Sequence, residues 1–296
     1  MHRTIVITGA GGGLGGVFAR KFASDGYQVA VLDFNLVAAQ SVARQIADEG
    51  GSALAVQCDV TDKASLEAAR EKVRIAFGKP NVLLNCAGIQ DPLAKTSSER
   101  YVKGDELDTK VAKMDEAKDP ETARKELLAK RRSFFNLDEK ALERVMRVNW
   151  LGTVISCQVF AVDLVGSEGN SIINITSMAA YNPLSLVLAY ASSKAAVDMF
   201  TKWLSNCLSG SDGKVRVNAV APGYFLTPLN HDMYVAPDGT YTPRYQNVIR
   251  CTPMDRLGDP AELYGALKFL ADPSLSGYIT GQVIAVDGGF LSCPGV

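Results

Sequence analysis

Short, continuously apolar runs alternate with longer amphipathic stretches along most of this 296-residue chain. Uninterrupted apolar runs are expected where helices cover both faces of a parallel sheet. Strands are predicted near residues 3–8, 28–33, 52–58, 81–85, 171–176, 214–220 and 282–286. Helices are predicted near 14–25, 36–49, 62–77, 138–165, 190–209 and 260–271. This alternation predicts an α/β fold with a mostly parallel, seven-stranded sheet in one doubly wound domain spanning 1–296.

Two segments do not follow this alternation of strands and helices. More than half of residues 103–132 are charged with both signs, which predicts a helical insertion within about 91–137. The insertion is either a solvent-exposed helical segment without a chemical role, or it serves as a lid or as a contact between subunits. The second segment, about 224–256, follows the sixth strand, and we expect it to cover the active site as a substrate lid.

Composition excludes several classes of protein. The formal net charge is −1, so the basic excess of a nucleic-acid-binding protein is missing. No apolar run approaches the length of a membrane span, and the first residues lead into a strand without a signal peptide. Six cysteines without a CxxC pair indicate free thiols and a cytoplasmic location. Two histidines make a His-rich metal site or a Ser-His-Asp triad unlikely, so no metal is expected.

A glycine-rich loop follows the first strand and opens the first helix, where backbone N–H groups can approach a diphosphate. It fits either GxGxxG at Gly11, Gly13 and Gly16 or TGxxxGxG at Thr8, Gly9, Gly13 and Gly15. The second strand ends in Asp33, whose carboxylate can bind a ribose 2′-hydroxyl and repels a 2′-phosphate. NAD is therefore expected rather than NADP, on a Rossmann-type domain. A helix-capping role is the alternative for Asp33.

Two further strand ends are candidates for the cofactor site. Asp59-Val60 follows the third strand, where the carboxylate could reach an adenine amino group or cap the next helix. Asn85, Ala87 and Gly88 follow the fourth strand, where small residues leave room beside a nucleotide.

Tyr190 and Lys194 are four residues apart and therefore share a helical face. The ordinary pKa of tyrosine is about 10, and a neighbouring ammonium is expected to lower it. Ser177 follows the strand at 171–176, at the carboxyl edge where ligands bind in such sheets. Asn149 is a polar residue within the apolar helix before that strand. It is either functional or a core-edge amide bonded to backbone.

Together these motifs resemble the short-chain dehydrogenase/reductase family over nearly the whole chain, with Cys86 where a second Asn is usual. The resemblance implies that Tyr190 transfers a proton, with Lys194 lowering its pKa and binding the nicotinamide ribose. It implies that Ser177 orients the substrate oxygen and Asn149 supports a water relay. The implied cofactor contacts also include Leu14, Pro222, Gly223 and Thr227.

The polar lid favours a polar or anionic small-molecule substrate, with Asn182, His231, Arg244 and Arg250 as candidate contacts. The run Ala221–Thr227, the run Asp238–Arg244 and Val286–Phe290 resemble the sugar-acid branch of the family, the D-mannonate oxidoreductases or fructuronate reductases. The expected reaction interconverts a secondary alcohol and a ketone on a sugar acid such as D-mannonate or D-fructuronate.

Two alternatives stay open. One is another substrate on the same machinery: a 3-oxoacyl-carrier-protein substrate, a polyol or gluconate. The other is a dinucleotide-sensing regulator without turnover, although Ser177, Tyr190 and Lys194 are all present. The family resemblance also implies a homotetramer or a homodimer.

Overall fold

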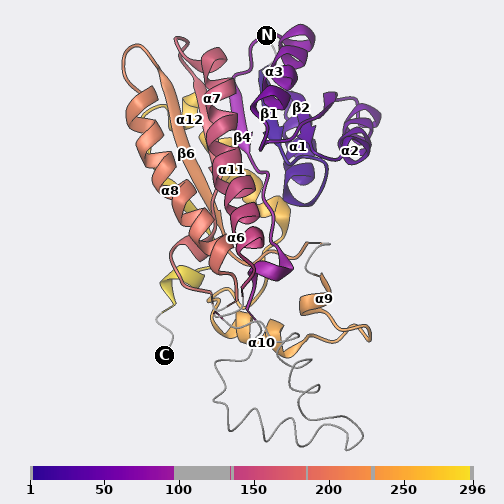
Figure 1. Cartoon of the computed structure of the whole chain (residues 1–296). Coiled ribbons are helices and arrows are strands. Elements are labelled where there is room, and N and C mark those ends of the chain that lie inside the picture. The colour runs from indigo at the N-terminus through magenta and orange to yellow at the C-terminus, as the bar shows by residue number, and fades with distance from the viewer. Residues whose placement is uncertain (1–2, 97–133, 135–136, 185, 228–230, 294–296) are drawn as a thin grey trace, which may run out of the picture.

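The computed structural model describes residues 3–96, 134, 137–184, 186–227 and 231–293. The predicted insertion at 103–132 lies outside the described residues. The chain forms one α/β domain around a single sheet, and Figure 1 shows α9 and α10 beyond one end of that sheet.

The sheet has seven strands in the order β3-β2-β1-β4-β5-β6-β7. Every neighbouring pair is parallel, so the sheet is entirely parallel rather than mostly parallel. The order reverses between β1 and β4, and ligands bind open α/β sheets at the carboxyl ends beside such a reversal. The strands are β1 Thr4–Thr8, β2 Gln28–Asp33, β3 Ser52–Gln57, β4 Val82–Asn85, β5 Asn170–Ile175, β6 Val215–Pro222 and β7 Val283–Val286.

Helices cover both faces of the sheet. Ile5 and Ile7 of β1 pack in one apolar core with α1 (Gly13–Ser24), α2 (Leu36–Asp48) and α11 (Tyr264–Ala271). Val6, between them, packs in the other core with α3 (Lys63–Phe77), α7 (Gly152–Leu164) and α8 (Leu188–Leu208). This division follows from the period-two alternation of side chains along a strand. The predicted elements are confirmed to within two residues at each boundary.

Local capping explains several helix starts. Asn35 accepts a hydrogen bond from the Ala38 backbone N–H at 3.2 Å and caps α2. Asp259 and Glu262 form a capping box, and the segment begins with a 3₁₀ turn, η5 (Pro260–Leu263), before α11. Such boxes satisfy backbone donors that the helix itself leaves unpaired.

The predicted helix at 138–165 consists of three parts. It runs through α6 (Glu139–Met146), a π-helical turn η3 (Arg147–Leu151) and α7. This run, Glu139–Leu164, is long and apolar enough to cross a membrane, which corrects the expectation that no segment is. Within the fold, 44% of its apolar window is buried.

The segment predicted as a lid contains two short helices that the pattern did not predict. These are α9 (His231–Tyr234) and α10 (Pro243–Arg250). The Thr242 hydroxyl accepts a hydrogen bond from the Tyr245 backbone N–H at 3.2 Å and caps α10. The remaining short elements are η1 (Pro92–Ala94), η4 (Met178–Ala180), α12 (Pro273–Ser276) and η6 (Phe290–Ser292).

Candidate active site

Tyr190, Lys194 and Ser177 meet at the carboxyl end of β5. Tyr190 and Lys194 lie one turn apart near the start of α8, and the Lys194 Nζ is 5.7 Å from the centroid of the Tyr190 ring. Lys194 is 4% exposed, and its Nζ donates a 2.8 Å hydrogen bond to the Ile175 carbonyl. Ser177 is buried at the start of η4 and hydrogen-bonds the Tyr190 phenol. These are the groups that the sequence expected to find together.

The pKa of Tyr190 differs in direction from the expectation. Burial raises the pKa of the phenol, the hydrogen bond with Ser177 lowers it, and the nearby Cys86 thiol raises it. Burial also lowers the pKa of Lys194 to about 8, while Cys86 acts in the opposite direction. Both side chains are thus biased toward their neutral forms, because desolvation penalises either charged form. The expected lowering of the tyrosine pKa by Lys194 is not produced by these protein groups alone.

Asn149 lies within the π-helical turn and is fully buried. Its Oδ1 accepts a 2.7 Å hydrogen bond from the Ile89 N–H, and its Nδ2 donates to the Ile89 carbonyl at 3.1 Å. Nδ2 also donates to the Ser193 hydroxyl at 3.0 Å, which in turn donates to the Tyr190 carbonyl at 2.7 Å. Asn149 therefore ties the loop after β4 to α8, matching the alternative of a backbone-bonded amide. π-Turns frequently occur at functional sites.

The glycine loop is shaped by close backbone approaches. A Cβ at Gly9, whose φ is +66°, would lie 2.6 Å from the Ala87 Cα, and one at Gly15 would lie 2.2 Å from the Gly9 carbonyl oxygen. Gly13 begins α1 with a φ of +52°. Glycine is needed at these positions because any side chain would collide with backbone or adopt a disfavoured conformation. Leu14 and Gly16 follow in the first turn.

Asp33 is held against this loop. Its Oδ2 accepts a 2.8 Å hydrogen bond from the Gly11 N–H and its Oδ1 accepts one from the Asn35 N–H at 2.9 Å. A Cβ at Gly11 would lie 2.8 Å from the Asp33 Cγ, so the loop closes over the carboxylate only because that residue is glycine. The helix cap of α2 is Asn35, not Asp33. The next side chain, Phe34, is 71% exposed and uncharged.

The loop after β4 is hydrogen-bonded to the end of β1. The Thr8 hydroxyl accepts hydrogen bonds from the backbone N–H groups of Cys86 and Ala87 at 3.2 and 3.3 Å. Asn85 is 3% exposed and points inward, where its Nδ2 donates to the Asn174 Oδ1 at 2.9 Å. The side chain of Asn85 is therefore engaged in the interior. A Cβ on Gly88 would lie 3.5 Å from the Lys194 Nζ, so this glycine borders the catalytic groups.

Two other predicted cofactor contacts lie at strand ends. The Asp59 carboxylate accepts hydrogen bonds from the Thr61 N–H and hydroxyl, both at 2.8 Å, whereas Asp62 caps α3. The capping alternative for Asp59 is therefore wrong. Val60 is 8% exposed and packs against the position of Gly152.

The loop after β6 passes close to the loop after β7. Pro222 ends β6, and the Gly223 N–H donates to the Val286 carbonyl at 2.9 Å. A Cβ at Gly223 would lie 2.5 Å from the Asp287 Cα. Thr227, further along, is half-buried.

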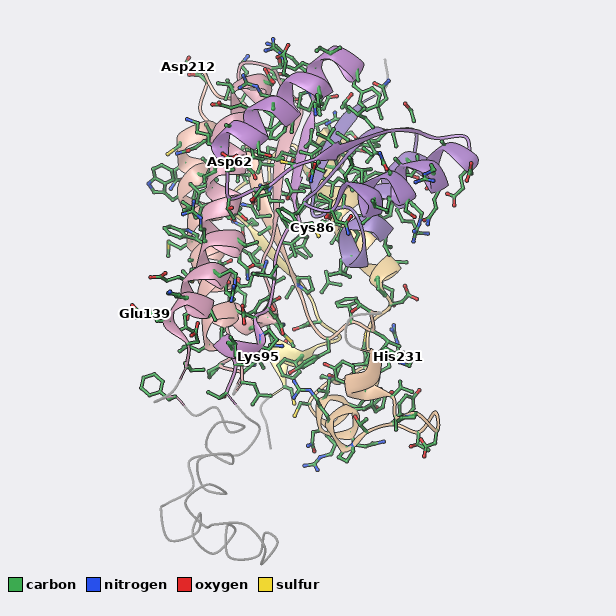
Figure 2. The ribbon with its side chains drawn as sticks, turned by 45° about the vertical axis from the view of Figure 1, so that its right-hand side comes forward. Asp62, Cys86, Lys95, Glu139, Asp212 and His231 are labelled. Atoms are coloured by element: carbon green, nitrogen blue, oxygen red, sulfur yellow. The ribbon has the colours of Figure 1, made fainter. Side chains whose placement is uncertain are left out.

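The four candidate substrate residues lie in different settings. Asn182 is half-buried after η4, and His231 is exposed at the start of α9. Arg244, in the first turn of α10, is half-buried beside Tyr234, whereas Arg250 is exposed at the last turn. In Figure 2, His231 lies toward the same end of the molecule as Lys95.

Sequence reasoning missed three side chains near the catalytic groups. Ser193 links Asn149 to the backbone of Tyr190. Cys86 was noted only as a departure from a motif, yet it affects the pKa of both Tyr190 and Lys194. Lys95 lines the same crevice as Tyr190. The available indication for Lys95 was its position as a cation after the fourth strand. It was missed because the charge-rich segment that follows contains many similar residues.

Comparisons with known proteins define the class. A profile described as short chain dehydrogenase matches residues 3–106, and one described as enoyl-(acyl carrier protein) reductase matches residues 123–291. An oxidoreductase of Bacillus subtilis (strain 168), itself uncharacterised, is 38% identical over 99% of this chain and 96% of the relative. With the Ser177, Tyr190 and Lys194 arrangement, these matches establish that the chain belongs to the short-chain dehydrogenase family of oxidoreductases.

Two further relatives differ in the substrate that their descriptions name. A crystal structure from Haemophilus influenza with bound NAD, provisionally described as a D-mannonate oxidoreductase, is 36% identical with a TM-score of 0.87. The match covers 99% of this chain and 96% of that chain. The 7alpha-hydroxysteroid dehydrogenase of Escherichia coli (strain K12) is 31% identical over 96% of this chain and 92% of the relative. Relatives at similar coverage therefore carry different substrate names.

Proposed function

We propose that this chain is an NAD(H)-dependent oxidoreductase that interconverts a secondary alcohol and a ketone on a sugar acid, such as D-mannonate and D-fructuronate. The observation that carries the reaction type is the half-buried Tyr190 side chain, whose phenol is hydrogen-bonded to Ser177 and one helical turn from Lys194. A positioned phenol of this kind can donate a proton to a carbonyl oxygen or accept one from an alcohol.

Each catalytic side chain has a distinct task in this proposal. Tyr190 holds the transferred proton on its phenol oxygen, and Ser177 donates a hydrogen bond to the reacting oxygen. Because burial raises the pKa of Tyr190, the neutral phenol is the resting form and is ready to protonate a ketone. For alcohol oxidation the phenol must lose its proton, which a positive charge close to it favours. Lys194 provides that charge when it is protonated.

Asn149 positions these groups and is the proposed support of the proton relay. It fixes the loop at Ile89 and, through Ser193, the backbone at Tyr190. The buried amide thereby keeps the start of α8 in register with the strand ends.

The described residues fit a bound dinucleotide. The glycine cradle at Gly9 and Gly15 admits no side chain, which suits a backbone-lined diphosphate site at the start of α1. When bound, NAD(H) supplies the hydride acceptor or donor. Asp33 at the end of β2, followed by an uncharged Phe34, favours NAD over NADP because a carboxylate repels a 2′-phosphate. The other proposed contacts are Thr8, Gly13, Leu14, Asp59, Val60, Asn85, Ala87, Gly88, Tyr190, Lys194, Pro222, Gly223 and Thr227.

The sugar-acid assignment is supported by the Haemophilus influenza structure and by the polar segment at 224–256, which we propose to be the substrate lid. A lid over an acyl chain would be mainly apolar. Arg244 on this segment is half-buried, whereas Arg250 is exposed, so Arg244 is the better placed of the two for an anionic substrate.

We also propose a cytoplasmic homotetramer or homodimer. All six cysteines are free thiols, which is typical of a reducing compartment. Val162 on α7 and Met199 and Trp203 on α8 are 55%, 65% and 59% exposed, and exposed apolar groups of this size are typical of subunit contacts. Sedimentation equilibrium would test the assembly; a monomer at micromolar concentration would contradict it.

The substitution Tyr190→Phe tests the proposed chemistry. It removes only the phenol oxygen, so NADH binding, followed by fluorescence, should be nearly unchanged while turnover falls by at least about a thousandfold. The substrate panel consists of hexonates, ketohexonates, neutral polyols and an acyl thioester, each with both cofactors. Near-normal activity of the variant would refute the role of Tyr190. Turnover of acyl thioesters alone, with NADPH, would refute the sugar-acid assignment.

A further inference from the structure

Lys95, which lines a narrow crevice with Tyr190, lies within electrostatic range of Arg244, a cation from a separate segment. Lys95 directly follows η1, and Arg244 lies in the first turn of α10. Burial lowers the pKa of Lys95, and the positive charge of Arg244 lowers it further, while Asp91 acts in the opposite direction. Like charges disfavour each other at short range, so this arrangement costs free energy unless an anion joins it.

The neighbouring carboxylate is already engaged. Asp91 accepts a 2.8 Å hydrogen bond from the Arg144 Nε and forms an ion pair with the same guanidinium. Its Oδ1 also accepts a 2.8 Å hydrogen bond from the Leu93 N–H at the start of η1. Arg144 thus offsets the charge of Asp91, and the pair formed by Lys95 and Arg244 stays net positive.

The guanidinium of Arg244 is incompletely satisfied. Its Nε is buried and has no hydrogen-bond partner. Two phenols lie near it: Arg244 hydrogen-bonds Tyr234 and lowers the pKa of both Tyr224 and Tyr234. Within the same part of the chain, no carboxylate forms an ion pair with Lys95 or Arg244. A buried donor without a partner is unfavourable, and a ligand that accepts from it removes that cost.

Of the two cations, Lys95 borders the candidate reaction centre. Lys95 and Tyr190 line one narrow crevice together with Asp91 and Val187. The charge of Arg244 lowers the pKa of Tyr224, which follows Gly223 just beyond the end of β6. Figure 2 shows Lys95 and His231 toward one end of the molecule, with Cys86 nearer its middle. An anion between the two cations would therefore sit at the outer side of the site, away from the cofactor loop.

We propose that Lys95 and Arg244 together bind the carboxylate of the substrate and hold a hydroxy or keto acid by its charged end with its reacting carbon at Tyr190. This assignment rests on the proposed function and adds the group that selects an acid over a neutral polyol. Arg244 supplies a planar donor pair for the carboxylate, and Lys95 supplies a point charge from the opposite segment.

The test compares charged and neutral substrates in single variants. Lys95→Met and Arg244→Met remove each charge while keeping an unbranched apolar chain, and Lys95→Arg restores the charge. Lys63→Met is the matched control, because Lys63 lies 61% exposed on α3 in an i,i+4 pair with Glu67. Readouts are KM and kcat for D-mannonate and D-mannitol, the Kd for NADH, and inhibition by succinate, a carboxylate that the reaction does not consume.

The expected result is selective. Each Met variant should raise the KM for D-mannonate by about ten- to a hundredfold, as for a lost hydrogen bond to a charged group. D-Mannitol turnover and the NADH Kd should change less than about twofold, and Lys95→Arg should recover most of the loss. An equal loss for both substrates, or an unchanged KM for D-mannonate, overturns the inference while leaving the proposed function intact.

Failure of the proposed function gives a different pattern. If wild-type protein oxidises D-mannitol but no hexonate, the sugar-acid assignment fails, and succinate inhibition then tests the cation pair alone. Competitive inhibition that disappears in Lys95→Met and Arg244→Met but persists in Lys63→Met supports an anion site there. Absence of inhibition in the wild type, or equal inhibition in every variant, overturns it.

Discussion

Replacing the buried Lys194 by methionine should abolish catalysis and stabilise the protein. Burial lowers the pKa of this lysine from its ordinary 10.5 to about 8, so its charged form is disfavoured in the folded state. A difference of this size corresponds to about 3 kcal/mol in the free energy of unfolding. The substitution also removes the 2.8 Å hydrogen bond to the Ile175 carbonyl, which costs about 1 kcal/mol. Lys194→Met should therefore gain about 2 kcal/mol at pH 7.

The pH dependence of this gain has a defined sign. Below pH 8 the lysine is protonated in both states, so the folded wild type carries the full penalty. Between about pH 8 and 10.5, Lys194 is protonated to a smaller extent in the folded protein than in the unfolded chain. The free energy of unfolding of the wild type therefore rises relative to that of the variant. Cys58 and Cys157, whose pKa values burial raises to about 12, titrate in both proteins and cancel in the difference.

The assay is urea unfolding of both proteins without nucleotide from pH 6.5 to 10.5, followed by circular dichroism. Lys202→Met is the control, because Lys202 lies on the same helix, half exposed and 3.1 Å from Asp198, so its removal should change stability by less than about 1 kcal/mol. A Lys194→Met protein no more stable than wild type at pH 7, or a difference that does not shrink as the pH rises to 10.5, would refute the reasoning.

Two further substitutions test other parts of the site. Asp33→Arg should shift the ratio of kcat/KM for NADP over NAD upward by at least about tenfold, because it replaces a repulsive carboxylate by a cation at the end of β2. An unchanged ratio would exclude Asp33 from the ribose site. Asn149→Ala leaves the buried Ile89 N–H without its 2.7 Å acceptor, so the free energy of unfolding should fall by about 1–3 kcal/mol. Turnover should fall as well, and denaturant unfolding with steady-state kinetics measures both; loss of activity at unchanged stability would argue against a positioning role.

The positions of the strands and of the main helices along the chain were predictable because local patterns fix them. Continuous apolar runs marked β1, β2, β4 and β5, and amphipathic stretches marked the main helices between the strands. The π-turn around Asn149 was not predictable, because it depends on Ile89 and Ser193, which lie far away in the sequence. The short helices α9 and α10 were missed because few residues contribute to so brief a periodicity.

The candidate site was predictable to a similar extent. Spacing placed Tyr190 and Lys194 on one helical face, and the end of β5 placed Ser177 near them. The direction of the Tyr190 pKa was not accessible, because it depends on how completely the fold removes water from the phenol. The roles of Lys95 and Cys86 likewise depend on neighbours that only folding supplies.

The amino-acid sequence by itself determined the parallel α/β architecture, the glycine cradle, the acid at the end of β2 and the position of Tyr190 and Lys194 on one helical face. These features rest on local periodicity and on residue types at fixed spacing. Tertiary structure alone decided which charges are desolvated and which are paired. Folding places Lys95 within electrostatic range of Arg244 and pairs Asp91 with Arg144. It also lowers the pKa of Lys194 below its ordinary value. Electrostatic free energies depend on distance and solvent exposure, and neither exists before the chain has folded.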